Sequence, residues 1–221
     1  MYHLLVRQRA ACTRANVRQV YLQLGILGRR APARSRTTDS RHEHERYPNI
    51  VKELLVNRPN QVWVADTLEL FIGGRKAFLA LVEDMYTRRV MGLALSFSNN
   101  ALLTREALEM SLLKGTPEIH HSDQGKPYAA DLYTLRLIRL RVTVSMAAAG
   151  KAWENGYAER LNRTFRREEI VRTEYNNIRD ARTAIGAYAK LYNELRIHMS
   201  LGYQTPEEVK EAYARDNETG E

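Results

Sequence analysis

The sequence predicts an α/β fold built on a mixed β-sheet, and two features of the chain after residue 60 carry this prediction. First, three β-rich stretches at residues 62–70, 76–84 and 89–97 are joined by short turns, which indicates an antiparallel meander. Second, helical and β-rich stretches alternate from residue 101 onward. Parallel strands need a crossover that is usually helical, so the alternation predicts a parallel part of the same sheet.

The alternating half fixes the expected order of elements. Helices are predicted at 101–113 and 128–140, short strands at 119–123 and 142–146, and a long helical segment from about Trp153. Three antiparallel strands followed by helix, strand, helix, strand and helix is the order of the ribonuclease-H-like fold. In such mixed sheets, functional residues gather where strands end.

Helical extensions are expected on both sides of this sheet domain. Residues 14–27 place apolar side chains at spacings of three and four, as an amphipathic helix does. Residues 29–46 are rich in Arg, Ser, Thr and Pro and indicate a linker. Two more helical stretches cover about 178–195 and 206–215.

Composition limits the class of protein. The chain has 221 residues, of which 44% are hydrophobic and 27% charged, as in ordinary globular proteins. It lacks an apolar run of membrane-spanning length and the hydrophobic region of a signal peptide, so we expect a cytoplasmic protein without a membrane partner. Cys12 is the only cysteine, which excludes a disulfide framework and a cysteine-based zinc site within one chain.

The charge favours a nucleic-acid partner. The net charge is +8 and the pI is about 9.7. Residues 1–46 hold ten Arg against three acids, a net of +7, whereas residues from Pro206 to the end carry six acids against two bases. A merely solubilising surface is the alternative for such a surplus.

Three carboxylates are candidates for a catalytic metal site. Asp66 lies within an apolar strand, where an ionisable residue is disfavoured unless it is paired or metal-bound. Asp123 ends a short strand, and Glu159 lies in the last long helix of the predicted domain. Each also has an ordinary interpretation: a solvent-facing Asp on an edge strand, an Asp-x-Gly turn, and a surface Glu.

The neighbours of Glu159 favour the functional interpretation. Its helix face is expected to be polar and cationic, and the opposite face apolar, with the residues Asn155, Asn162, Arg163 and Arg166 on the first and Ala158, Leu161 and Phe165 on the second. Gly156 is unfavourable inside a helix and suggests a close approach of backbone or substrate. Glu154, the nearest rival carboxylate, lies about 140° away around the helix.

Phosphodiester cleavage explains why three such carboxylates would be needed. The reaction requires an activated oxygen nucleophile and a stabilised leaving oxygen, and a pair of Mg²⁺ or Mn²⁺ ions provides both. These hard cations prefer carboxylate oxygens and water. Three carboxylates that converge from separate elements would suffice to hold two ions.

Four segments resemble one known family in the order expected. NQVWVADTLEL, HHSDQGKPY and AWENGYAERLNRTFRREE are similar to segments of bacterial insertion-sequence transposases with an integrase catalytic core, members of the retroviral integrase superfamily. Between Asp123 and Glu159 lie 35 residues (124–158), which is the family's spacing. The tail resembles the family's C-terminal signature at Tyr192, Asn193, Arg196, His198, Leu201, Gly202, Thr205 and Pro206.

The resemblance implies a polynucleotidyl transferase with an Asp-Asp-Glu site. Asp66, Asp123 and Glu159 would be the metal ligands for two Mg²⁺ or Mn²⁺ ions, and the activity would be 3′-end cleavage followed by strand transfer. The partners would be transposon ends and target DNA, bound by a homo-oligomer in a synaptic complex inside a bacterial cell. DNA-binding roles are expected for Lys151, Asn155, Arg163 and Arg166.

The front of the chain resembles the end of a helix-turn-helix region, with NVRQVYLQLGI similar to a recognition helix. Too few residues precede Asn16 for a complete motif, so we expect an N-terminally truncated copy. The expected division is a partial DNA-binding segment at 1–28, a basic linker at 29–57, a catalytic core at 58–175 and a helical extension at 176–221.

Two alternative functions remain at this point. One is a ribonuclease-H-like nuclease that cleaves without joining, and the other is a non-catalytic DNA-binding remnant. Other conspicuous residues are expected to be structural: His120 and His121 in packing or hydrogen bonds, His42 to Glu45 in the linker, Asp84 in a turn, and Glu69 on the strand face opposite Asp66. Glu83 closes the second strand and is not assigned a catalytic role.

Overall fold

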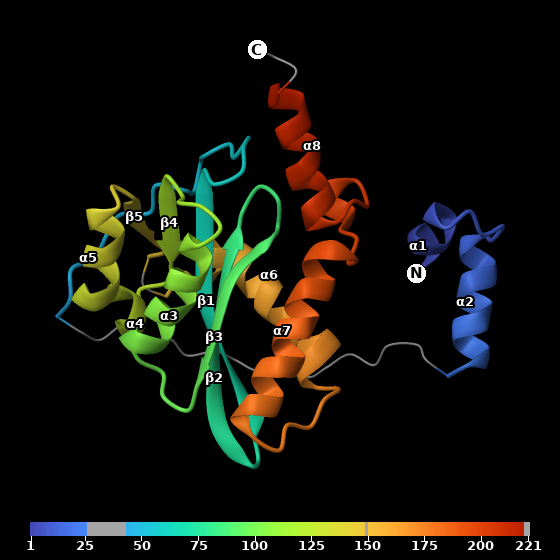
Figure 1. Cartoon of the computed structure of the whole chain (residues 1–221), viewed down its shortest axis with the longest axis horizontal. Coiled ribbons are helices and arrows are strands. Elements are labelled where there is room, and N and C mark those ends of the chain that lie inside the picture. Colours follow the sequence, from blue (N-terminus) through green and yellow to red (C-terminus); the bar gives the residue numbers. More distant parts are fainter. Residues whose placement is uncertain (26–42, 149, 219–221) are drawn as a thin grey trace.

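The computed structural model of this protein describes residues 1–25, 43–148 and 150–218. The core of the described part is one five-stranded sheet in the order β3-β2-β1-β4-β5 (Figure 1). The antiparallel strands are β1 (Val62–Ile72), β2 (Arg75–Asp84) and β3 (Val90–Ser96). The parallel strands β4 (Ile119–Ser122) and β5 (Thr143–Met146) extend the sheet from β1. The predicted mixed sheet is therefore confirmed.

Helices cover both faces of the sheet. The helices α3 (Ala101–Leu112), α4 (Lys126–Ala129) and α5 (Asp131–Arg139) lie on one face, and α6 (Gly156–Phe165) and α7 (Ile178–Glu194) lie on the other. Residues of β1 alternate between the two hydrophobic cores, because successive side chains of a strand point to opposite faces. Trp63 and Ala65 pack into the first core, and Leu68 and Leu70 into the second.

Two predicted helices are subdivided in the structure. The stretch predicted as one helix over 128–140 is split at Ala130, whose extended backbone (φ −65°, ψ 141°) separates α4 from α5. The segment from Trp153 begins as a 3-10 turn, Ala152–Asn155, continues as α6 and ends as a π-helical turn, Arg166–Ile170. Periodicity alone does not distinguish these tighter and wider turns from an α-helix.

Of the two explanations predicted for Gly156, the close approach of backbone was wrong. This residue is the first of α6, not an interior position, and a Cβ added to it would meet open space. Close approach by backbone is therefore not the reason for a glycine there. Gly92 is the position where such an approach occurs, because an added Cβ would lie 2.2 Å from the carbonyl oxygen of Ala107 in α3.

The last turn of α7 is fixed to the edge strand β3. The Asn193 side chain forms two hydrogen bonds with the backbone of Val90. Its Oδ1 accepts from the Val90 N–H (2.8 Å), and its Nδ2 donates to the Val90 carbonyl oxygen (3.1 Å). Arg196 forms an ion pair with Glu168 at 2.8 Å. Two members of the C-terminal signature thus attach the tail to the core, and Asn193 also satisfies backbone groups at a sheet edge.

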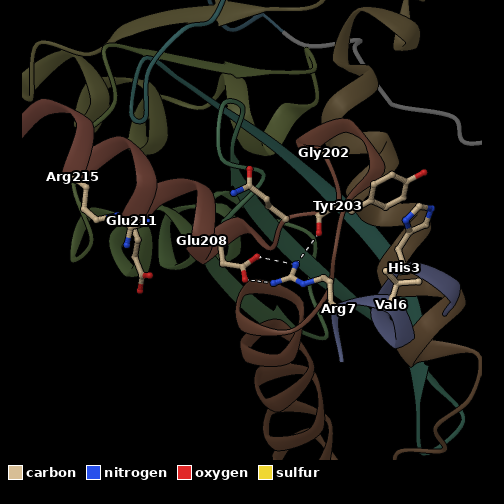
Figure 2. Close-up of a pocket in the computed structure, with 9 residues that line it drawn as sticks. His3, Val6, Arg7, Gly202, Tyr203, Glu208, Glu211 and Arg215 are labelled. Atoms are coloured by element: carbon tan, nitrogen blue, oxygen red, sulfur yellow. Dashed lines mark hydrogen bonds and ion pairs between the residues drawn. The ribbon is translucent and has the colours of Figure 1, made fainter. Parts of the chain in front are cut away.

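The chain ends described here are helical and touch each other. The first helices are α1 (Tyr2–Arg7) and α2 (Arg14–Gln23), and the last are the 3-10 turn Met199–Leu201 and α8 (Pro206–Glu218). In Figure 2 the Arg7 guanidinium reaches the tail, where it donates to the Tyr203 carbonyl oxygen (2.8 Å) and pairs with Glu208. The ring of His3 stacks on Tyr203 with 3.5 Å between centroids.

The predicted linker is described only in part. Residues 29–42 lie outside the described residues, whereas Val51, later in the same interval, is buried against Val62, Val64 and Ala158. Among the described helices, none has the length and apolar character needed to cross a membrane.

Candidate active site

Asp66 occupies the centre of the sheet. β1 is the middle strand, and the Asp66 side chain lies on the face covered by α6, where the residue is only 2% exposed. Its Oδ2 accepts a hydrogen bond from the Asn162 Nδ2 (2.7 Å) and its Oδ1 accepts one from the Thr67 N–H (2.8 Å). The alternative of a solvent-facing Asp on an edge strand was therefore wrong.

Asp123 follows the neighbouring parallel strand at the same level. The last paired residues of β1 and β4 are Val64 and His121, and Asp66 and Asp123 each lie two residues farther along. Parallel strands run side by side, so this register brings the two aspartates to adjacent strand positions. The Asp123 Oδ1 also accepts from the Gly125 N–H at 3.0 Å, which confirms the predicted Asp-x-Gly turn.

Helix α6 carries Glu159 and is held on β1 by apolar and polar contacts. Ala158, Leu161 and Phe165 are buried, as the sequence predicts for the sheet-facing side. Asn162 binds Asp66, and the Nδ2 of Asn155 donates to the carbonyl oxygen of Ala65 at 3.0 Å. The two amides therefore attach α6 to consecutive residues of β1.

Glu159 lies between these two amides on the helix surface. It is four residues after Asn155 and three before Asn162, spacings that place side chains on one side of a helix. Glu159 is partly exposed, unlike both asparagines. Glu159 thus lies on α6 between the two asparagines that contact β1.

The predicted polar face of α6 divides into a buried and an exposed part. Asn155 is 3% exposed, and its amide donates to the backbone of β1. The sequence predicted an exposed, DNA-binding position for Asn155, and the structure shows a buried contact instead. Arg163 and Lys151 are exposed, and Arg166 is partly exposed. The sequence placed Asn162 on this face but did not identify it as the partner of Asp66, because periodicity gives the side of a helix and not the atom it meets.

The donors around Asp66 suit a hard cation, although the described residues contain no preformed cluster of three His, Cys, Asp or Glu side chains able to hold a metal ion. The buried Oδ1 atoms of Asn155 and Asn162 have no hydrogen-bond partner. A buried acceptor without a donor is costly, and it is satisfied by water or a cation. Oxygen ligands of this kind are those that Mg²⁺ and Mn²⁺ prefer.

The two histidines before Asp123 make hydrogen bonds to protein groups, as predicted. The His120 Nε2 lies 3.0 Å from the Tyr133 hydroxyl, and the His121 Nδ1 lies 2.9 Å from the Ser145 hydroxyl. Burial lowers the pKa of His120 to about 3 and that of His121 to about 4. Both imidazoles are therefore neutral at physiological pH.

The loop before α6 is anchored by Glu154, the rival of Glu159. Its Oε2 accepts from the Ala148 N–H and from the Asn49 Nδ2, both at 2.9 Å. These hydrogen bonds, the Ala148 one first, lower the pKa of Glu154 below its ordinary value. The carboxylate of Glu154 is thus used to shape the loop.

The remaining acids of the first two strands have structural contacts. Asp84 accepts from the Thr87 N–H and hydroxyl, each at 2.7 Å, which confirms the predicted turn. Glu69 forms an ion pair with Lys76 at 3.1 Å and is partly exposed. Glu83, in contrast, is buried, and burial raises its pKa to about 8.

Comparison with known proteins identifies the family. Two models of the integrase core domain match, one over residues 56–152 and one over residues 140–206. The chain is 31% identical to the insertion element IS600 uncharacterized 31 kDa protein of Shigella sonnei, over 80% of this chain and 67% of that protein. The chain belongs to the insertion-sequence transposases with an integrase core. It is also 27% identical to the transposase for insertion sequence element IS629 of Shigella sonnei, over 95% of this chain and 71% of that transposase.

Solved structures confirm the fold of this transposase. The HTLV-2 integrase catalytic core domain in complex with magnesium matches with a TM-score of 0.55 and 17% identity, over 69% of this chain and 97% of that one. A chain of the simian T-cell lymphotropic virus intasome in complex with PP2A regulatory subunit B56 gamma matches with a TM-score of 0.61 and 16% identity, over 78% and 60%. The predicted ribonuclease-H-like fold is therefore confirmed. Members of the family are polynucleotidyl transferases that act on DNA with divalent metal ions.

Proposed function

We propose that this transposase cleaves the 3′ ends of a mobile element and joins them to target DNA, with Asp66, Asp123 and Glu159 as its metal ligands. The observation that supports this most is the hydrogen bond between Asn162 and the buried carboxylate of Asp66. It joins the helix that carries Glu159 to the strand that carries Asp66, while the β1–β4 register brings Asp123 to the neighbouring strand. These contacts support the proposal by putting the three acids on neighbouring elements near the middle of the sheet: β1, the end of β4 and α6.

The residues present would hold two Mg²⁺ or Mn²⁺ ions through oxygen atoms. Such ions, when bound, supply Lewis acidity to the attacking and leaving oxygens of a phosphodiester. Asp66 is held in place by Asn162 and Thr67, so its position is set in advance. Glu159 is partly exposed, and we expect it to be the ligand whose side chain moves most as the site is completed.

DNA would approach the site along the exposed side of α6. Arg163 and Arg166 follow Glu159 by one and two helical turns, and Lys151 precedes the helix. These cations would neutralise phosphates and position the strand without reading its sequence. The helices α1 and α2 at the basic front of the chain are the proposed contact with the element's ends, and the reaction would take place in a homo-oligomeric synaptic complex.

The test is a strand-transfer assay with a matched pair of variants. Labelled duplexes made from the two flanks of the genomic element that encodes the chain are incubated with the protein and Mg²⁺ or Mn²⁺. Asp123→Asn removes a metal ligand and keeps an oxygen that can accept from the Gly125 N–H, so the turn is preserved. Asp131→Asn, on the exposed start of α5, is the control.

We expect cleaved and joined products with the unmodified protein and with Asp131→Asn, and a loss of at least about a thousandfold with Asp123→Asn. Cleavage without joining would contradict the proposal and indicate a nuclease. Binding of the duplex in a gel-mobility assay without metal-dependent chemistry would contradict the proposal and indicate a non-catalytic DNA-binding remnant.

A further inference from the structure

The turn between β2 and β3 contacts helix α6 through a strained residue. Arg88 has a backbone φ of 64°, in the left-handed region that residues other than glycine rarely adopt. The turn is closed by hydrogen bonds from the Arg88 N–H to the Asp84 carbonyl oxygen and from the Asp84 N–H to the Arg89 carbonyl oxygen, both 2.9 Å. Such a conformation persists only where its surroundings impose it, and it often marks a functional constraint.

The strained backbone places the Arg88 guanidinium on the first turn of α6. Its central carbon lies 3.8 Å from the centroid of the Tyr157 ring, a close cation–π contact. Arg160 approaches the same ring at 5.7 Å. The ring of Tyr157 is therefore contacted by two cations, one from the turn and one from its own helix.

The same two arginines also act electrostatically on a buried acid of β2, Glu83. Glu83 pairs with Val64 of β1, is 3% exposed, and has a buried Oε2 without a hydrogen-bond partner. Arg88 and Arg160 are the cations that act on its carboxyl, and Asp84 and Tyr192 are the other groups that influence it. Glu83 is two residues from Leu81 along β2, and Leu81 packs in the core that α6 covers, so the regular alternation of the strand points Glu83 to the same side.

We propose that Arg88 is a positioning residue for the active site: its left-handed turn holds the guanidinium on the Tyr157 ring and thereby fixes the start of the helix that carries Glu159. Tyr157 and Glu159 are about 200° apart around the helix. The contact between Arg88 and Tyr157, called the clamp below, therefore acts on the side of the helix opposite the carboxylate. Asn162 tethers the same helix one turn after Glu159. The clamp and the tether together fix both the position and the rotation of α6.

Substitution by glycine separates this role from the stability of the turn. Arg88→Gly removes the guanidinium while supplying the residue that adopts a positive φ without strain, so the turn itself is not weakened. Arg141→Gly is the matched control, since Arg141 is exposed, has a φ of 60° and lies in the turn before β5. Arg88→Lys retains the positive charge without the planar group that stacks on a ring.

The first measurement is hydrogen exchange of the full-length protein, without metal or DNA. We expect the amides of α6 to exchange about fivefold to tenfold faster in Arg88→Gly than in the unmodified protein, with Arg88→Lys between them. Arg141→Gly should leave α6 unchanged, and peptides of β1 and β2 should be unchanged in every variant. Equal exchange of α6 in both glycine variants, or a uniform increase over the whole chain, would overturn the proposal.

The second measurement links the clamp to chemistry and rests on the proposed function. In the strand-transfer assay, Arg88→Gly should lower kcat about tenfold and change the KM for DNA less than about twofold, because Glu159 is displaced while the DNA-binding surface stays. An unchanged kcat beside faster exchange of α6 would overturn the positioning role. If the unmodified protein lacks strand chemistry altogether, the proposed function fails, whereas the exchange result still decides whether Arg88 clamps α6.

Discussion

Helix α6 and the N-terminal helices are attached to the rest of the chain in contrasting ways. α6 is held by buried groups: Asn162 contacts a carboxylate that is 2% exposed, and the apolar side of the helix is packed on the sheet. The helices α1 and α2 contain no buried residues, and the ion pair between Arg7 and Glu208 has side chains 40% and 37% exposed. The difference lies in access to water.

Access to water sets how much free energy each attachment contributes to stability. A buried polar group that loses its partner costs about 1–3 kcal/mol, because no solvent replaces the lost bond. An exposed ion pair contributes about 0–1 kcal/mol and is weakened by salt. We therefore expect the core that carries the three carboxylates to be rigid, and the contact between α1 and α8 to be easily broken and remade.

The largest effect on stability is expected at the most buried acid. Glu83 has a pKa of about 8 in the folded protein, raised from 4.5 first of all by burial. The folded state therefore binds one more proton than the unfolded state between these values, so this group makes stability fall as the pH rises from 4.5 to 8. Glu83→Gln removes that dependence, and the variant should gain up to a few kcal/mol relative to the unmodified protein at pH 8.

Urea unfolding at pH 6.5 and pH 8 measures this effect. The pKa values of His120, His121 and His198 are lowered to about 3, 4 and 4, so these groups add the same pH dependence to the variant and to the unmodified protein, and the comparison between the two removes it. Glu69→Gln, on the partly exposed pair with Lys76, serves as the control and should follow the unmodified protein. A variant at position 83 with the same pH dependence as the unmodified protein would show that Glu83 is ionised in the folded state at neutral pH.

The tether between α6 and β1 should give an intermediate effect. Asn162→Ala removes the amide that binds Asp66, and we expect the free energy of unfolding to fall by about 1–3 kcal/mol. Urea unfolding measures the loss, with Arg163→Ala, one residue farther on the exposed side, as the control. Equal stabilities of the two variants would contradict the assignment of the tether as a buried interaction.

The smallest effect is expected at the N-terminal contact. Arg7→Ala removes the ion pair with Glu208 and the hydrogen bond to Tyr203, yet it should lower the stability of the sheet domain by less than about 1 kcal/mol. Hydrogen exchange of α1 should rise in this variant, and added salt should raise it in the unmodified protein. Arg18→Ala on the exposed surface of α2 is the control. A large loss of core stability would mean that the two regions are not attached as differently as their burial indicates.

Strand patterns and spacing predicted most of the fold. The β-rich stretches within 62–97 and the short turns between them predicted the antiparallel meander, and the later alternation of helices and strands predicted the parallel part, both of which the structure contains. The break at Ala130 and the 3-10 and π turns around α6 were missed, because they depend on backbone angles that periodicity does not report. Gly156 was misread for the same reason, since its place at the start of α6 was not visible in the pattern.

The order of residues along the chain establishes which side chains are available and how far apart they are: Asp66 in an apolar strand, Asp123 after the next parallel strand, and Glu159 within a helix. Which atoms meet depends on how the elements pack. Asn162 was predicted to share the polar face of Glu159, and the structure shows that it donates to Asp66. Glu83, unassigned from the sequence, is buried in the sheet domain. Local periodicity fixes the direction of a side chain on its own element, whereas burial and partners depend on packing between elements that are distant in the chain.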